Sequence, residues 1–414
     1  LCFETGSAAD PAGQAGLAAL TARLLTRGTS RRSAPEVATA IETLGAKIGA
    51  SSGHDFSYVH ANSATDVFDE TAALWAEIAR DPAYTATEVE RVKTQLLDEL
   101  RLARSRPSSV ANASISRLVY GAAPYGSAVS GTPKSIPGLT HTDLAAFHRS
   151  RWRPSQATLI FSGDIDPDAA FRLAERLFGD WTDASDAHPP TAAPAGYPVA
   201  ARFFLVDHPG AAQASVRLVQ RAIARTDPAY YPLLVANAVL GGGYSARLNR
   251  RIRVERGLSY GARSSLATRK AAGLLTAATE TRNEAVPEVL SIILGELHKL
   301  GTETVTSHEL GTRRAALLGE FGRSLETVDG LGQYVAHLAL HGLPLSELQR
   351  HNEHVSAVTP EQVRAATSQH LAAADSSVVV VGDAARFFDQ VAANHPNAER
   401  VPAETIDFDS PSLR

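Results

Sequence analysis

Two side chains in the second half of the chain, Arg253 and Tyr260, are of types that could do chemistry on a polar substrate. They lie seven residues apart, around an expected helix end and before an expected strand. A guanidinium and a phenol can both donate hydrogen bonds to a carbonyl oxygen whose negative charge grows in a transition state. The structural alternative is that Arg253 pairs with a nearby glutamate and Tyr260 packs at the end of the strand.

A run of three glycines precedes this pair, at Gly241, Gly242 and Gly243. It matches neither of the glycine patterns that cradle nucleotide phosphates, and it follows an expected helix rather than a strand. We therefore expect the end of a helix and a mobile loop here. The basic residues that follow are typical of a solvated helix face; they are Arg247, Arg250 and Arg251.

The 14 histidines suggest no metal site with a recognisable spacing. His337 and His341 are four residues apart without an adjacent acid, and the order of residues from His351 to His354 does not fit a zinc-binding helix motif. We expect both pairs to lie on the surface or to pack, and no metal to be bound by this chain. No nucleophile motif frames a Ser/His/Asp set. Cys2, the only cysteine, is expected to be a small core residue.

The composition is that of a globular protein, with 44% apolar and 20% charged residues among 414. The net charge of −4, from 40 basic and 44 acidic residues, gives no reason to expect nucleic acid or an anionic membrane as a partner. No apolar run is long enough to predict a membrane span. Arginine outnumbers lysine 35 to 5, which is typical of a GC-rich genome and favours a bacterial protein, for which we expect the periplasm, with the cytoplasm as the alternative.

A proline-rich stretch divides the chain into two parts of similar length. Residues 185–200 contain four prolines and no apolar periodicity, which predicts an interdomain linker. The sequence thus predicts a domain over residues 1–184 and a second domain over residues 201–414.

The two parts resemble each other at three places in chain order. A capped helix followed by an apolar strand and Gly-Asp occurs in both, as do one long-helix start and one strand. Three matches with nearly constant offsets indicate a duplicated unit. The matched pairs are Thr140 with Thr359 and Gly163 with Gly382 at an offset of 219, Glu88 with Glu309 at 221, and Phe3 with Leu218 at 215.

Hydrophobic periodicity predicts strands and helices in separate blocks, which favours an α+β fold with a largely antiparallel sheet in each half. The second half begins with two strands and the first half with one, so we expect a further first strand upstream of Leu1. The predicted helices cover 34–44, 68–79, 88–103, 232–240, 246–255, 285–300 and 307–325; the predicted strands cover 1–5, 51–62, 157–162, 202–206, 214–219 and 377–381.

The segment from Gly6-Ser7 through Gly16-Leu17-Ala18 to Gly28-Thr29 resembles the insulinase/pitrilysin-like zinc metallopeptidases, the inverzincins. The resemblance continues through the Pro124-Tyr125-Gly126 turn, and it implies the LuxS/mitochondrial-processing-peptidase-like metallopeptidase fold with two homologous α+β domains. The register places Ala19, Ala22 and Arg23 where the family carries His-x-x-Glu-His. None of these side chains can bind zinc. The family's third zinc ligand is a carboxylate on a later helix. Its position falls on Glu99 when counted from Arg23, and on Leu97 when aligned on Glu90-Arg91.

The same resemblance makes Arg253 and Tyr260 similar to the family's arginine–tyrosine pair, which reaches the substrate backbone near the scissile bond. It also implies peptide contact at Gly241, Gly242 and Gly243. Some members divide the labour between a zinc-bearing subunit and a partner that lacks zinc but keeps the pair.

This chain resembles the second kind, of which the mitochondrial processing peptidase alpha subunit is an example. The resemblance implies a bacterial heterodimer whose partner holds the zinc and whose substrates are unfolded peptides. The alternative is a structural subunit or a standalone peptide-binding protein.

Overall fold

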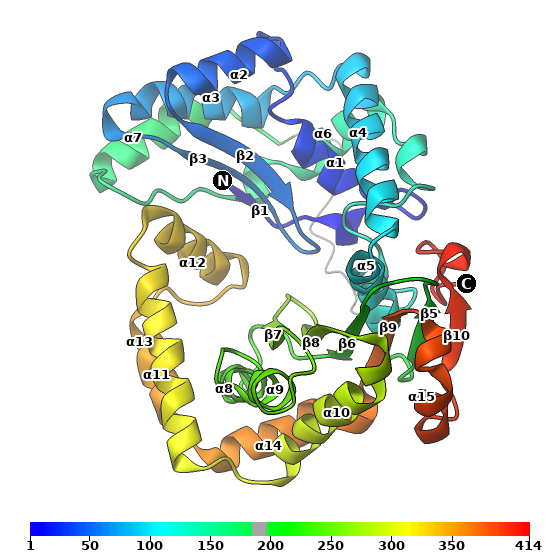
Figure 1. Cartoon of the computed structure of the whole chain (residues 1–414). Helices are drawn as coiled ribbons and strands as arrows, with labels where there is room; N and C mark the ends of the chain where they lie inside the picture. The colour runs from blue at the N-terminus through cyan, green and yellow to red at the C-terminus, as the bar shows by residue number, and fades with distance from the viewer. Residues whose placement is uncertain (184–195, 197) are drawn as a thin grey trace. The chain divides into compact units, whose positions relative to one another are not determined.

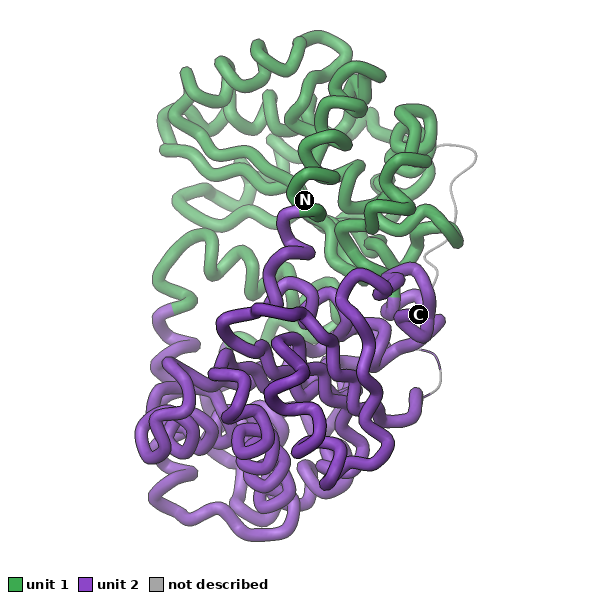
Figure 2. The backbone as a smooth tube through the Cα atoms, turned by 45° about the vertical axis from the view of Figure 1, so that its right-hand side comes forward, with its two compact units in different colours: residues 1–101, 127–193, 324–348 green, residues 102–126, 194–323, 349–414 purple. Residues whose placement is uncertain are grey.

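The computed structural model describes residues 1–183, 196 and 198–414, and its elements are drawn in Figure 1. The chain forms two compact units, coloured in Figure 2. Unit 1 consists of the described parts of residues 1–101, 127–193 and 324–348, and unit 2 of the described parts of residues 102–126, 194–323 and 349–414. Most of the predicted linker 185–200 lies outside the described residues.

Unit 1 is built on a four-stranded antiparallel sheet in the order β2-β3-β1-β4. Side chains alternate between its two faces, since successive residues of a strand point to opposite sides. Phe3 therefore lies in the core beneath helices α1 (Leu17–Leu24) and α3 (Phe68–Arg80), whereas Cys2 packs with Ala336 and Leu340 of α12 (Val328–Leu340). The strands are β1 (Cys2–Phe3), β2 (Lys47–Ser52), β3 (Ser57–Asn62) and β4 (Ala157–Thr158).

Two helices of unit 1 start at capping boxes that are visible in the sequence. Ser33 with Glu36 and Thr140 with Asp143 both form reciprocal capping boxes. The helices are α1 (Leu17–Leu24), α2 (Ala34–Thr43), α3 (Phe68–Arg80), most of α4 (Ala86–Arg104), α6 (His141–Arg151), α7 (Pro167–Phe178) and α12 (Val328–Leu340).

Unit 2 contains a six-stranded mixed sheet in the order β10-β5-β9-β6-β8-β7. The β10–β5 and β5–β9 pairs are parallel and the other three are antiparallel. Figure 1 shows α5 on one face of this sheet and α8, α10 and α14 on the other. The strands are β5 (Phe203–Asp207), β6 (Ala214–Arg221), β7 (Ala262–Ala267), β8 (Leu274–Thr281), β9 (Ser377–Gly382) and β10 (Glu399–Pro402).

The remaining helices belong to unit 2 or begin or end in it, and Thr359 with Gln362 forms a third capping box at α14. They are α5 (Pro107–Tyr120), α8 (Tyr230–Leu240), α9 (Arg247–Asn249) with a π-helical segment (Arg250–Glu255), α10 (Val286–Thr302), α11 (Ser307–Ser324), α13 (Glu347–Ala357), α14 (Pro360–His370) and α15 (Phe388–Asn394). No helix in the described part of the chain is long and apolar enough to span a bilayer.

The duplication inferred from the sequence recurs in the strand order. The arrangement β2-β3-β1-β4 of unit 1 is repeated by β7-β8-β6-β9 of unit 2. Phe3 pairs with Ser57 and Ala157, and its predicted counterpart Leu218 pairs with Ala277 and Val378 of the corresponding strands. The predicted α+β class with two related units is therefore confirmed.

The compact units differ from two contiguous stretches of chain. Helix α5 follows β3 and α4 in the sequence but packs on β6 and β9, while α12 packs on β1 and β4. Each sheet thus buries one face under a helix from the other half of the sequence. Periodicity within a helix predicts that an apolar stripe exists, but not which sheet the stripe will cover.

Two predicted strands differ from the observed ones. The predicted strand 51–62 is a hairpin, because Gly53 donates a backbone hydrogen bond to Phe56 (2.8 Å) and closes a turn between β2 and β3. The predicted strand 157–162 pairs only over Ala157–Thr158.

Candidate functional site

Arg253 and Tyr260 are neighbours in unit 2, and Tyr244 joins them. The guanidinium carbon of Arg253 lies 4.8 Å from the ring centroid of Tyr260 and 5.1 Å from that of Tyr244. Both distances fall within the range of cation–π contact. We call these three side chains the arginine–tyrosine cluster.

The guanidinium of Arg253 has no acidic partner among the described residues, which contradicts the structural alternative stated for it. The three arginines nearest to it in the sequence are paired: Arg250 and Arg251 with Glu255, and Arg256 with Glu288. The donors of Arg253 are thus available to a ligand, whereas those of its neighbours are engaged in ion pairs.

The two tyrosines of the cluster are unusually exposed for aromatic residues. Tyr260 is 89% exposed and Tyr244 is 68% exposed. Large aromatic side chains normally bury most of their surface, and a group of them at the surface indicates an interaction site. Tyr260 therefore does not pack at the end of its strand.

Threonines of β8 hold the segment that carries Tyr260. Thr281 donates from Oγ1 to the carbonyl of Leu258 (2.6 Å), and Thr279 donates to that of Gly261 (2.8 Å). Since both threonines are buried at the end of β8, the backbone on each side of Tyr260 is fixed while its ring stays in solvent.

The helix before the cluster is anchored by Arg247, which is structural rather than solvated. It makes two hydrogen bonds of 2.9 Å to Glu309 and is 9% exposed. Burial raises the pKa of Glu309, but the hydrogen bonds and charge of Arg247 outweigh burial and leave that pKa below its ordinary value. The prediction of a solvated face was wrong for Arg247 and holds for the half-exposed Arg250 and Arg251.

The glycine run begins at the end of α8, as the sequence predicts. The N–H of Gly241 donates to the carbonyl of Asn237 and completes the last turn of that helix. A Cβ at Gly241 would collide with the backbone nitrogen of Ser264, and one at Gly242 would lie 2.6 Å from the Cα of Ala238. These two glycines are thus required by close backbone packing. Gly243 has more room, and peptide contact by the three residues stays a prediction.

The positions that match the zinc motif lie on α1 in unit 1. The carboxylate of Asp10 positions this helix by accepting hydrogen bonds of 2.9 Å from the N–H groups of Gly16 and Ala18. Ala22 is buried, Ala19 is half-buried and Arg23 points outward. The methyl groups at 19 and 22 offer no ligand atom, so these residues do not fit a zinc ion.

Arg23 forms a bidentate ion pair with Glu99 of α4, at 2.9 and 2.5 Å. The structure thus decides between the two distal positions, because Glu99 faces position 23 while Leu97 packs against the core. The hydrogen bonds from Arg23 hold the pKa of Glu99 below its usual value. A guanidinium therefore occupies the place beside this carboxylate where the family's motif has a metal-binding histidine.

The histidine pairs are packed. The rings of His337 and His341 are 4.5 Å apart, and His341 contacts Phe56 edge-on. His351 stacks on Phe321 at 4.0 Å. No group of three or more His, Cys, Asp or Glu residues that could hold a metal ion occurs in the described residues.

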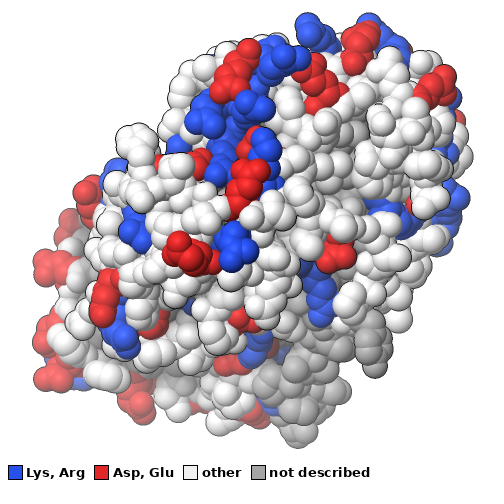
Figure 3. Space-filling model, turned by 90° about the horizontal axis from the view of Figure 1, so that it is seen from below, with Lys and Arg blue, Asp and Glu red and all other residues white. Residues whose placement is uncertain are grey.

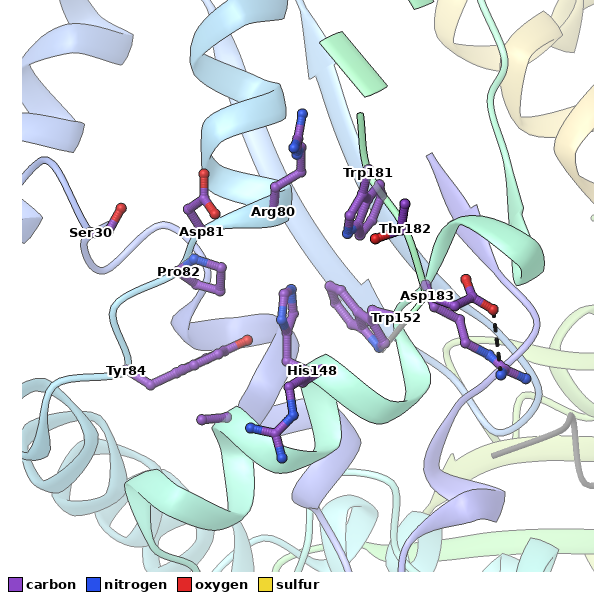
Figure 4. A pocket seen from close by; sticks show the side chains of 13 residues that line it. Ser30, Arg80, Asp81, Pro82, Tyr84, His148, Trp152, Trp181, Thr182 and Asp183 are labelled. Atoms are coloured by element: carbon purple, nitrogen blue, oxygen red, sulfur yellow. Dashed lines mark ion pairs between the residues drawn. The ribbon is translucent and has the colours of Figure 1, made fainter. Parts of the chain in front are cut away.

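A separate pocket of about 490 Å³ lies in unit 1, and Figure 4 shows its lining. None of its residues belongs to the arginine–tyrosine cluster or to the zinc-motif positions. His148 of α6 forms part of its wall, donates from Nε2 to the carbonyl of Ala79 (2.9 Å) and contacts Tyr84 and Trp152. Burial lowers the pKa of His148 to about 4.

This shift predicts a pH-dependent stability of unit 1. The pKa of His148 in the folded protein lies below the ordinary value of 6.5. The contribution of the neutral imidazole to the free energy of unfolding is therefore complete above pH 6.5 and is lost as the pH falls towards 4. Between pH 7 and pH 4 we expect wild type to lose about 3 kcal/mol of unfolding free energy relative to His148→Gln. Urea denaturation followed by tryptophan fluorescence measures this, since Trp75, Trp152 and Trp181 all lie in unit 1. The same substitution at the exposed His298 is the control, and parallel curves for His148→Gln and wild type would contradict the prediction.

Acidic and basic side chains are interspersed on the face of the molecule seen in Figure 3, with uncharged surface around them. The ion pairs of Arg250, Arg251 and Arg256 have the same mixed character. A broad field of one sign, which would attract a polyanion, is not present on this face.

Sequence reasoning missed two residues of the candidate site, Tyr244 and Asn249. Tyr244 directly follows the glycine run, and an aromatic residue after a flexible run was the available signal. Asn249 is 4% exposed, and its amide contacts the loops of both tyrosines. No local pattern marked it.

Comparisons with known proteins cover most of the chain. Residues 1–133 match the model of insulinase (peptidase family M16), and residues 138–317 match that of the peptidase M16 inactive domain. Uncharacterized zinc proteases of Mycobacterium leprae and Streptomyces coelicolor are 25% and 26% identical, covering 88% and 89% of this chain and 82% of each relative. A solved peptidase M16 inactive domain from Pseudomonas fluorescens superposes with a TM-score of 0.82 at 26% identity, covering 92% of this chain and 91% of its own.

Proposed function

Because the chain belongs to the peptidase M16 family, we propose that it is the substrate-binding subunit of a heterodimeric zinc peptidase. It would supply Arg253 and Tyr260 in trans to a homologous partner that carries the zinc. The substrates would be unfolded peptides, cleaved in a chamber that the two subunits enclose.

One contrast carries the proposal. The metal position of this chain is filled by the Arg23–Glu99 ion pair, whereas Arg253 stays without an acidic partner in the described residues and beside an 89% exposed Tyr260. A purely structural subunit has no use for an unpaired arginine and exposed tyrosines. The retained cluster therefore favours substrate binding over a structural role.

The chemistry of the cluster suits a peptide carbonyl. In-plane guanidinium N–H groups and a phenolic O–H donate to an oxygen, and both would bind it more tightly as its negative charge grows during attack on the carbonyl carbon. No residue of this chain acts as the base in this proposal. The cluster would hold the scissile carbonyl while the chemistry occurs on the partner.

The sheets also offer a place for an extended peptide. β2 and the two-residue β4 are the outer strands of the unit 1 sheet, and β2, with six residues, has no strand on its other side among the described residues. The outer strands of the unit 2 sheet are β7 and the four-residue β10, and on β7 the N–H groups of Ala262 and Ser264 are already bonded to Asn249 and Gly241. β2 is therefore the edge that we expect to pair with substrate.

Co-expression with a zinc-motif homologue encoded beside this chain tests the proposal. We expect no peptidase activity from the isolated chain and zinc-dependent cleavage of an unfolded peptide from the purified complex. Stoichiometric zinc or peptidase activity in the isolated chain would overturn the proposal. A complex whose activity equals that of the partner alone would favour a structural subunit without a role in substrate binding.

A further inference from the structure

A buried asparagine connects the two loops that carry the tyrosines of the cluster. Nδ2 of Asn249 donates to the carbonyl of Tyr244 (2.6 Å), and its Oδ1 accepts from the N–H of Ala262 (3.2 Å), two residues after Tyr260. Asn249 is 4% exposed and directly precedes the π-helical segment Arg250–Glu255 that carries Arg253. One amide thus touches the backbone on both sides of the arginine.

We propose that Asn249 and Tyr244 are positioning residues for Arg253, with Asn249 fixing the two tyrosine loops and Tyr244 orienting the guanidinium by ring contact. This inference rests on the proposed function, because it assumes that Arg253 binds the substrate carbonyl. It goes beyond that proposal by assigning roles to two residues outside the Arg253–Tyr260 pair.

The amide of Asn249 performs both halves of this contact at once. The partner at Tyr244 is a carbonyl, which needs a donor, and the partner at Ala262 is an N–H, which needs an acceptor. An aspartate at position 249 would keep the acceptor but would set a carboxylate oxygen against the carbonyl of Tyr244. Because the site is buried, water cannot replace the lost donor at low cost.

The role of Tyr244 follows from the geometry of arginine. The five N–H donors of a guanidinium lie in its plane, and its faces interact with aromatic rings. Contacts with the rings of both Tyr244 and Tyr260 restrict the plane of Arg253 while leaving its edge for a ligand. Since no acid competes for that edge among the described residues, the tyrosines are the restraint on its direction.

The loop that bears Tyr244 is held at a second point. Arg313 of α11 donates from Nη2 to Oγ of Ser245 (2.7 Å) and is 5% exposed. Two hydrogen-bonded anchors therefore hold the backbone directly after the Tyr244 side chain, one at its own carbonyl and one at the next side chain. Its exposed ring is thus carried on fixed backbone and not on a loose loop.

Asn249→Asp and Tyr244→Ala test the inference in two assays. On the isolated chain, amide hydrogen exchange over residues 241–246 and 257–263 should become faster in Asn249→Asp. In the active complex, Asn249→Asp should lower kcat by about 10- to 100-fold with little change in KM, because misplacing a group by a fraction of an ångström is costly. Tyr244→Ala should lower kcat about 5-fold, and Tyr244→Phe should restore it, since the ring and not the hydroxyl makes the contact.

Asn394→Asp is the matched control, because it adds the same charge to an exposed site at the end of α15 in the same unit. Unchanged amide hydrogen exchange in Asn249→Asp would overturn the role of Asn249 in holding the two tyrosine loops. Faster exchange with wild-type kcat, while Arg253→Ala is inactive, would overturn the positioning role and leave the proposed function standing. Wild-type kcat in Arg253→Ala would instead refute the proposed function. Tyr244→Ala changes an exposed residue, so the ring contact remains testable even where Asn249→Asp does not fold.

Discussion

Arg253→Ala in the active complex should lower kcat about 100- to 1000-fold and leave assembly intact, because it removes a charged donor from the carbonyl whose charge develops in the transition state. The effect should fall on kcat more than on KM, since the bond strengthens as the reaction proceeds. Tyr260→Phe, which removes a single neutral hydrogen-bond donor, should cost about 10-fold. Steady-state cleavage of an unfolded peptide measures both.

Arg250→Ala is the matched control for Arg253→Ala. It removes the same charge from the same π-helical segment, but its guanidinium is already paired with Glu255. We expect its turnover to stay within about 2-fold of wild type. An equal loss in both variants would mean that the local positive potential matters and not the specific donor, and wild-type turnover in both would refute a catalytic contribution of Arg253.

The triple substitution Ala19→His, Ala22→Glu and Arg23→His should give a chain that binds zinc with a stoichiometry near one. Arg23 already reaches Glu99 with Nη1 and Nη2 of its guanidinium, so positions 23 and 99 face each other. A histidine at 23 with a metal ion beside it would span a similar gap, and a histidine at 19 lies one turn earlier on the same face of α1. Two imidazoles and a carboxylate form a known zinc ligand set.

The control for this experiment is the same triple variant with Glu99→Gln, which removes the third ligand and should lose most of the affinity. Zinc content after dialysis and calorimetric titration provide the measurements. If the triple variant binds no zinc although its circular dichroism is unchanged, α1 and α4 are not placed as in a metal site. The retained Glu99 would then be structural only.

Much of the fold could be read from local signals. Capping boxes at Ser33, Thr140 and Thr359 involve residues three positions apart, and all three mark helices as expected. The repeated strand order also follows from a duplication visible in the sequence. The hairpin of β2 and β3 was missed because Gly53 and the residues after it interrupt the alternation over too short a stretch to be noticed.

The sequence alone established that residues 19, 22 and 23 cannot bind zinc, and it singled out Arg253 and Tyr260 as a candidate pair. These conclusions depend on side-chain type and on spacing along one segment. The pairing of Arg23 with Glu99, 76 residues away, could not be obtained in this way, and neither could the absence of an acidic partner for Arg253 among the described residues. Glu255, two residues from Arg253, could have neutralised it, but it pairs with Arg250 and Arg251. Glutamates of α10 and α11 pair with Arg247, Arg251 and Arg256.

Tertiary packing likewise brought Tyr244 and Asn249 into the site, and it placed α5 and α12 on sheets of the opposite half of the sequence. The physical reason is common to all of these cases. Helix caps and periodic stripes are satisfied by neighbours a few residues away, so they leave a pattern in the chain. The Arg23–Glu99 ion pair and the covered sheet faces are completed by residues far along the chain, and the contacts of Asn249 by two loops that fold back onto it, so which residues those are depends on how the elements pack.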